Sequence, residues 1–155
     1  MIRFTGSIPR CVQQSWWTVP QILNDWSKYN MKMKELFDRG EFVVSAEVGP
    51  PKGIHVDELV EEAKTYLTGV HAVNVTDNQS SVMRLGSLAM CKVLKDAGMD
   101  PIFQLACRDR NRIALESDLL SAAMLGIENI LCLTGDHTKM GDHPQAKPVF
   151  DLDSV

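Results

Sequence analysis

Four short apolar runs recur along the chain, and polar, turn-forming residues follow each of them. The runs begin about thirty residues apart and span residues 42–46, 72–75, 102–106 and 130–133. The segment between each pair of runs has apolar residues at helical spacing. This alternation predicts repeated β–α units that form a parallel sheet covered by helices. Since ligands of such sheets bind at the carboxyl ends of the strands, the polar residues there are candidates for a site.

The pattern predicts the limits of each element. Strands are expected at residues 42–48, 71–75, 101–106 and 129–133. Helices are expected at residues 31–39, 56–67, 81–97 and 109–125. Three of them precede glycines that suit helix ends, Gly40, Gly98 and Gly126. Residues 135–148 are expected to form a loop, and residues 150–155 to begin a further helix.

The helix at 109–125 is expected to turn four apolar side chains toward the core: Ile113, Leu119, Leu120 and Ala123.

The number of units leaves two architectures open. No GxGxxG follows the first strand and no phosphate-binding Gly-Lys-Ser/Thr motif occurs, which argues against the two commonest nucleotide-binding sheets. A (β/α)8 barrel needs about 250 residues, and four β/α units provide half of one. The chain is therefore expected to be either a compact open α/β domain or half of a barrel.

The first part of the chain differs from the rest in composition. All three tryptophans lie in the first thirty residues, where Pro9 and Pro20 interrupt any helical pattern. Residues 1–32 are therefore expected to be a poorly ordered extension, either an appended tail or a partner-docking arm. Residues 33–155 are expected to form the folded domain.

Composition excludes several classes of function. The net charge of -4 gives no basic field for nucleic acid or an anionic membrane, and no apolar stretch spans a bilayer. The four cysteines are scattered without a CxxC pair, which favours a reducing cytoplasm. His137 and His143 lack a third soft ligand nearby, so no metal site is expected.

Two acidic residues at strand ends are candidates for catalysis. Glu47 precedes Gly49-Pro50-Pro51, and partial desolvation there would suit a general acid; the alternative is a solvated carboxylate at the rim. Asp136 follows Gly135, and its carboxylate could accept from a heterocycle or stabilise a developing cation; the alternative is an ordinary turn residue.

Two polar runs are candidates for binding. Residues 76–79 carry hydroxyl, carboxylate and amide groups that could form hydrogen bonds with the ring or the ribityl chain of a ligand. The alternative is an Asx turn that leads into the next helix. Arg108, Arg110 and Arg112 could bind a phosphate or carboxylate, or form ion pairs between neighbouring units.

Together these motifs resemble those of methylenetetrahydrofolate reductases. The likeness lies in residues 42–53 (FVVSAEVGPPKG), 74–79 (NVTDNQ), 107–112 (CRDRNR) with 117–120 (SDLL), and 133–136 (LTGD) with 141–147 (GDHPQAK). The motifs occur in order across residues 33–155 and are most similar to the short bacterial and acetogen-type enzymes. The resemblance implies the N-terminal half of a flavin-binding (β/α)8 TIM barrel that reduces methylenetetrahydrofolate to methyltetrahydrofolate in one-carbon and methionine metabolism.

The resemblance also implies roles for individual residues. Glu47 matches the acid that helps to open the folate ring, and Asp136 matches the aspartate near flavin and pterin. The positions that match residues lining the FAD are Thr76, Asp77, Gln79, Gln104, Thr134, Gly135 and Asp136. NAD(P)H or another donor would supply electrons. The enteric-type enzymes have Arg and an aromatic residue where this chain has Thr134 and Asp77.

Four units imply an incomplete barrel. The alternative to an active reductase is an inactive fragment or binding subunit that needs a second chain, or a second copy, to supply the remaining strands.

Overall fold

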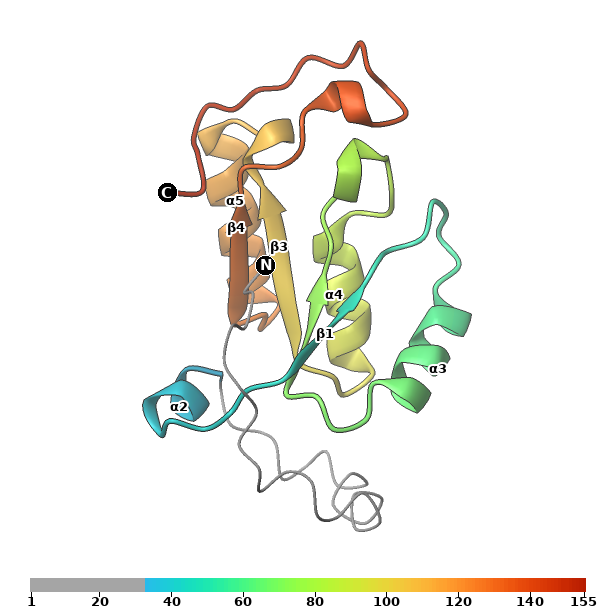
Figure 1. Cartoon of the computed structure of the whole chain (residues 1–155), viewed down its shortest axis with the longest axis vertical. Coiled ribbons are helices and arrows are strands. Elements are labelled where there is room, and N and C mark those ends of the chain that lie inside the picture. The colour runs from blue at the N-terminus through green and yellow to red at the C-terminus, as the bar shows by residue number, and fades with distance from the viewer. Residues whose placement is uncertain (1–32) are drawn as a thin grey trace, which may run out of the picture.

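A computed structural model of the chain describes residues 33–155, so the expected extension at residues 1–32 lies outside the described residues. The described part contains one sheet of four strands, β1 (Ser45–Val48), β2 (Ala72–Val75), β3 (Pro101–Ala106) and β4 (Asn129–Leu133). All neighbouring strands are parallel, and they lie side by side in chain order (Figure 1). This order has no reversal of the kind that defines a doubly wound sheet, and it is that of a partial (β/α)8 barrel.

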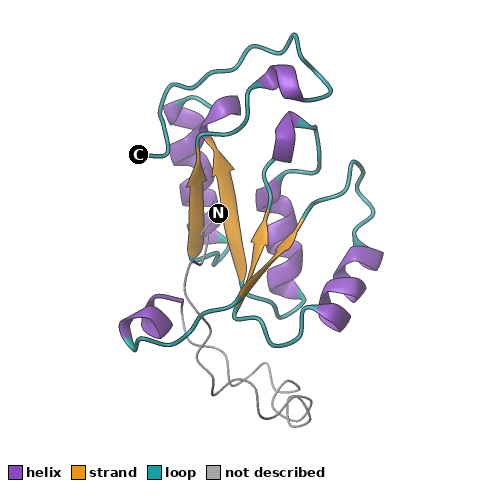
Figure 2. Ribbon diagram, viewed as in Figure 1, coloured by secondary structure: helices purple, strands orange, loops and turns teal. Residues whose placement is uncertain are grey.

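The helices of the described part are α2 (Met33–Asp38), α3 (Asp57–Tyr66), α4 (Ser87–Asp96) and α5 (Arg112–Met124). The three helices between consecutive strands, α3 to α5, cover one face of the sheet, and α2 precedes β1 (Figure 2). Three single 3₁₀ turns lie in the loops at the carboxyl edge: η3 (Gln79–Ser81), η4 (Cys107–Asp109) and η5 (Thr138–Met140).

Local sequence explains the ends of these helices. Asp57 and Glu58 lie in the first turn of α3, where their charge favours the positive end of the helix dipole. Asn111 caps α5, because its side chain accepts a hydrogen bond from the backbone N–H of Ala114 at 3.0 Å. Gly98 follows α4 with a positive φ, as predicted for a residue after a helix end.

The core lies between the sheet and these helices. Alternate strand residues such as Val73, Val75 and Phe103 are fully buried on the helix side, against Met90 and Leu94 of α4. The intervening residues lie on the opposite face, which we call the inner face. On it Glu47 pairs in register with Asn74, and Asn74 with Ile102. The inner face therefore carries polar side chains such as Glu47, Asn74 and Gln104 beside apolar ones such as Ile102.

Three predicted elements, β1, α4 and α5, begin at least three residues later than expected. β1 starts at Ser45, not at residue 42, because a side chain there takes the place of a backbone acceptor from the neighbouring strand. The N–H of Val44 donates to Nδ1 of His71 at 3.1 Å. α5 starts at Arg112, not at residue 109, because η4 precedes it and Asn111 caps it. Similarly, α4 starts at Ser87, because the polar residues before it form η3 and an extended loop.

The helix expected at residues 150–155 is absent from the structure. Phe150 has a positive φ, and Asp151 accepts from the backbone N–H of Arg112 at 2.9 Å. This segment therefore lies as a strap across the start of α5 (Figure 1).

The predicted inward face of α5 is confirmed for Leu119, which packs half-buried against the core, and is wrong for Ile113, Leu120 and Ala123. Leu115 and Ala122 are buried, whereas Ile113 and Leu120 are 73% and 75% exposed. The reason is that apolar residues occur all around this helix, so the pattern does not single out one face.

We expect Phe103→Ala to lower the free energy of unfolding by about 3–5 kcal/mol, because it leaves a cavity in the fully buried core. The matched control is Phe37→Ala in α2, where the side chain is 54% exposed and the cost should be about 0.5 kcal/mol or less. Urea unfolding of both variants measures the difference, and equal losses would contradict the assigned core.

Candidate active site

The residues that the sequence singles out gather at the carboxyl edge of the sheet. Glu47 and Gln104 lie near the ends of β1 and β3, and Thr76 directly follows β2. Residues 134–136 directly follow β4, and Gln79 begins η3 in the loop after β2. The parallel sheet thus brings positions far apart in sequence to one edge.

Three of these residues lie on the inner face. Glu47 is exposed there, whereas Thr76 and Gln104 are buried. The hydroxyl of Thr76 is the one buried side-chain polar atom in the described residues without a hydrogen-bond partner. A Cβ added at Gly49 would lie 3.7 Å from this hydroxyl, so the β1 loop passes close to it. Since buried polar groups in folded proteins are nearly always paired, this hydroxyl marks a place where a ligand can bond.

The side chain of Asp77 lies on the helix side of the sheet. It is buried, and its carboxylate accepts from the backbone N–H of Ala106 at 2.9 Å and from Arg110 Nη1 at 2.6 Å. Its carboxylate therefore joins β2 to the loop after β3. The prediction that Asp77 lines a flavin stays a prediction.

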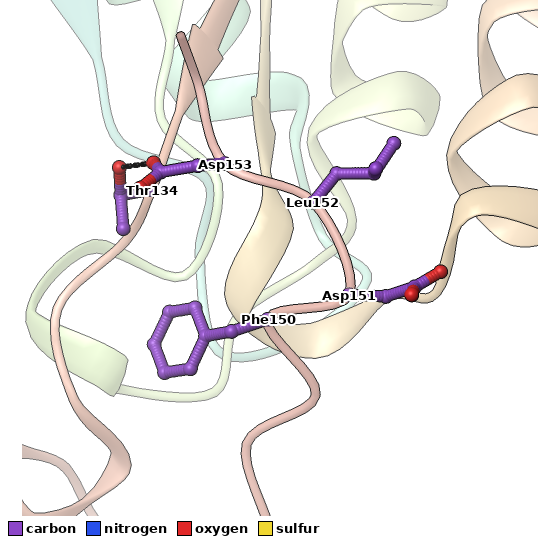
Figure 3. A pocket seen from close by; sticks show the side chains of 5 residues that line it. All are labelled: Thr134, Phe150, Asp151, Leu152 and Asp153. Atoms are coloured by element: carbon purple, nitrogen blue, oxygen red, sulfur yellow. Dashed lines mark hydrogen bonds between the residues drawn. The ribbon is translucent and has the colours of Figure 1, made fainter.

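The side chain of Thr134 is bonded to the C-terminal strap. Its hydroxyl bonds with Asp153, and with Ser154 at 3.0 Å. A shallow pocket of about 420 Å³ lies here, lined by Thr134 and by residues 150–153 (Figure 3). It shares only Thr134 with the predicted site. We place the candidate site at the strand ends instead, because the acids and the unpaired hydroxyl lie there.

The loops after β1, β2 and β4 are tied together by two aspartates. Asp136 accepts from the backbone N–H of Ser80 at 3.1 Å. Asp142 accepts from the backbone N–H of Met83 at 3.1 Å and pairs with Lys52 at 3.2 Å. Because of these bonds, the carboxylate of Asp136 has a defined position above the sheet edge.

The three arginines after β3 are all in ion pairs. The predicted pairing between neighbouring units is confirmed for Arg110 with Asp77, whereas Arg108 pairs with the adjacent Asp109. Arg108 pairs with Asp109, Arg110 with both Asp77 and Asp118, and Arg112 with Asp151. Burial lowers the pKa of Arg110, but the hydrogen bond and charge of Asp77 outweigh it and raise that pKa above its ordinary value. These arginines therefore serve to join loops of the chain.

Sequence reasoning missed several residues of this edge. Ser80 and Met83 contribute only backbone N–H groups, which no residue type signals. Arg84 bonds the carbonyl of Pro50 at 3.0 Å and so joins the β1 and β2 loops. Arg108 was singled out with the other two arginines, but its contacts with the loops after β2 and β4 were not predicted.

The described residues contain no group of three or more His, Cys, Asp or Glu side chains placed to hold a metal ion. Nor does any helix within residues 33–155 have the length and apolar character to cross a membrane.

Strand order, helices on one face, and polar groups at the carboxyl edge define a protein of the (β/α)8 barrel class. A family model for methylenetetrahydrofolate reductase matches residues 32–154. The chain therefore belongs to the methylenetetrahydrofolate reductase family, a family of oxidoreductases that generally use a flavin. A search of curated proteins returned no match.

We expect Arg110→Met to destabilise the fold by about 3–5 kcal/mol, because it leaves the buried carboxylate of Asp77 without its cation. Arg112→Met is the matched control: Arg112 is ion-paired too, but it is exposed, and its loss should cost about 1 kcal/mol or less. Chemical denaturation of the two variants gives the comparison. A small effect at both positions would show that the pair with Asp77 is not structural.

Asp109 should contribute to stability in a pH-dependent way. Burial raises its pKa, but the hydrogen bonds and charge of Arg108 outweigh this and hold the pKa below its ordinary value. A lowered folded-state pKa contributes stability above the unfolded pKa of about 3.9, and this is lost as the pH falls through the folded value. Between about pH 5 and pH 2, the wild type should therefore lose more stability than Asp109→Asn. Parallel stability curves for the two proteins would refute this.

Proposed function

We propose that this chain carries the flavin-binding strand ends of a methylenetetrahydrofolate reductase, which reduces methylenetetrahydrofolate to methyltetrahydrofolate with FAD. The proposal rests above all on the family match across residues 32–154. NAD(P)H or another donor supplies the electrons, and the reaction belongs to the one-carbon metabolism of the cytoplasm.

The residues at the sheet edge fit a flavin. The buried hydroxyl of Thr76 has no partner among the described residues, so a ligand with ring nitrogens or carbonyls can satisfy it. Gly135 has φ +89° and no side chain, so the turn after β4 can pack closely on Arg108 and Ala106 at this edge. Gln104, Gln79 and Thr134 provide further polar groups along the same edge. When bound, the flavin supplies the hydride chemistry, while the protein orients it.

Glu47 is the proposed general acid. It lies on the inner face near the end of β1, and no ion pair with it occurs among the described residues. Its proton would go to the folate nitrogen that leaves the methylene carbon when the five-membered ring opens. Next to it, the amide of Asn74 bonds Ser45 at 3.1 Å, so the neighbouring polar groups on this face are already ordered.

Asp136 is the proposed stabiliser of the cation. Ring opening leaves positive charge on the methylene carbon, and a fixed carboxylate lowers the energy of that charge. Asp136 is exposed at the edge, and Ser80 bonds one of its oxygens, Oδ2, at 3.1 Å. The other oxygen has no hydrogen-bond partner within residues 33–155 and can face the substrate.

The four strands of the described sheet are half the number that a closed barrel uses. We propose that catalysis needs four further strands beside β1 and β4. They could come from a longer polypeptide, a partner chain or a second copy. Activity is therefore best measured both with the chain alone and with a polypeptide that supplies those strands.

Binding of FAD is the direct test of the proposed function. The chain should take up FAD and show the visible absorbance of a bound flavin, with quenched flavin fluorescence. Thr76→Val, which has the same shape without the hydroxyl, should weaken binding about tenfold, the effect of losing about one hydrogen bond. A colourless protein that takes up no FAD, alone or with the further strands, would refute the proposal.

Glu47→Gln should lower turnover by about 10²–10⁴-fold while it changes FAD affinity less than about twofold, because the amide keeps the shape but cannot give up a proton. Glu41→Gln is the control, since Glu41 is exposed and precedes β1 at the opposite end of the strand. Steady-state reduction of the folate and a flavin titration separate the two effects. An equal loss of both in Glu47→Gln would refute the acid role.

A further inference from the structure

Arg108 is a buried charge at the centre of the candidate site. The residue is 2% exposed and lies in η4, just after the end of β3. Its Nε and Nη2 donate to the two carboxylate oxygens of Asp109 at 2.8 and 2.6 Å. This two-point contact neutralises the guanidinium, which could not otherwise lie buried.

The remaining contacts of Arg108 reach two other loops. Nη1 donates to the backbone carbonyl of Asp136 at 3.0 Å, and Nη2 donates to that of Asn78 at 3.3 Å. The backbone N–H of Arg108 donates to the carbonyl of Thr134 at 3.1 Å. One residue thus joins the loops after β2, β3 and β4.

The turn at Gly135 packs directly on this side chain. A Cβ built at Gly135 would lie 3.0 Å from Cβ of Arg108 and 3.6 Å from its Nη1. The next residue, Asp136, bonds Ser80, and Ser80 belongs to the loop that Arg108 holds at Asn78. The contacts therefore form a closed ring from Arg108 through Asp136, Ser80 and Asn78 back to Arg108.

The loop after β2 needs such support. Asn78, Ser80 and Ser81 all have φ between 46° and 62°, although none is a glycine. Residues in this region cost free energy and persist only where their surroundings hold them. The guanidinium supplies one such restraint at Asn78.

We propose that Arg108 is a positioning residue that fixes the carboxylate of Asp136 at the substrate edge. This role rests on the proposed function, in which Asp136 faces the cation. Arg108 touches neither the substrate nor the cofactor in this scheme and acts through the Gly135–Asp136 turn and the β2 loop. Lysine cannot replace it, because a single ammonium does not span the carbonyls of Asp136 and Asn78 and both oxygens of Asp109.

The test compares Arg108→Lys with Arg112→Lys in the full 155-residue chain. Both changes keep the charge, and both arginines pair with an aspartate, but Arg112 is exposed. Amide hydrogen exchange at Ser80 reports the bond to Asp136, and exchange at Phe103 in β3 reports the stability of the core. Arg108→Lys should raise exchange at Ser80 about 10- to 100-fold relative to Phe103 and weaken FAD binding by a similar factor. Arg112→Lys should change neither.

Gly135→Ala is the second variant, for the case that Arg108→Lys does not fold. It pushes the turn away from Arg108 and keeps every charge, so it should raise exchange at Ser80 alone. Equal increases at Ser80 and Phe103 would mean a merely structural role and would overturn the proposal. Unchanged exchange at Ser80 would overturn it as well.

The outcomes separate the two proposals. If the wild type takes up no FAD, the proposed function fails, and exchange at Ser80 still decides whether Arg108 holds the carboxylate. If the wild type binds FAD and Arg108→Lys matches it in both measurements, the function stands and the positioning role is refuted.

Discussion

The buried guanidinium of Arg108 is the interaction on which the carboxyl edge of this sheet depends. A charge in that place must be neutralised, and its other N–H groups must find acceptors. Asp109 neutralises it, and the carbonyls of Asn78 and Asp136 accept from it. These acceptors belong to the loops after β2, β3 and β4, so one desolvated cation sets the relative position of three loops. The sheet alone brings the strand ends together, but it does not determine how the loops above them fold.

Much of the fold could be predicted because the strands are apolar and regularly spaced. β3 and β4 were predicted to the residue, and Gly98 and Gly126 were placed after the ends of α4 and α5. Predictions failed where the local pattern does not carry the information. The buried face of α5 depends on packing, since apolar residues surround that helix. The late start of β1 depends on a histidine side chain from the next unit, which bonds Val44.

The candidate site, like the fold, could be predicted from the sequence only in part. That polar groups follow each strand was visible in the sequence, and the parallel topology brings them to one edge. Which side each group faces follows from the strand alternation, which continues past the strand ends. Thr76 therefore lies on the inner face, while the next residue, Asp77, directs its carboxylate to Arg110 on the helix side. Backbone donors such as the N–H of Ser80 carry no sequence signal at all.

The acidic residues at this edge fall into two groups, those that pair with an arginine and those that do not, and the two groups have different roles. Asp77, Asp109 and Asp151 each accept hydrogen bonds from an arginine, so their carboxylates are part of the structure that holds these loops. No arginine pairs with the carboxylates of Glu47 and Asp136 within residues 33–155. The carboxylate of Asp136 accepts from a backbone N–H, and Arg108 bonds only the backbone carbonyl of Asp136. A group that must give up a proton works poorly in an ion pair with an arginine, because the permanent positive charge would hold it ionised. The arginines therefore bind the acids that build the site and leave unpaired the two that the proposed chemistry uses.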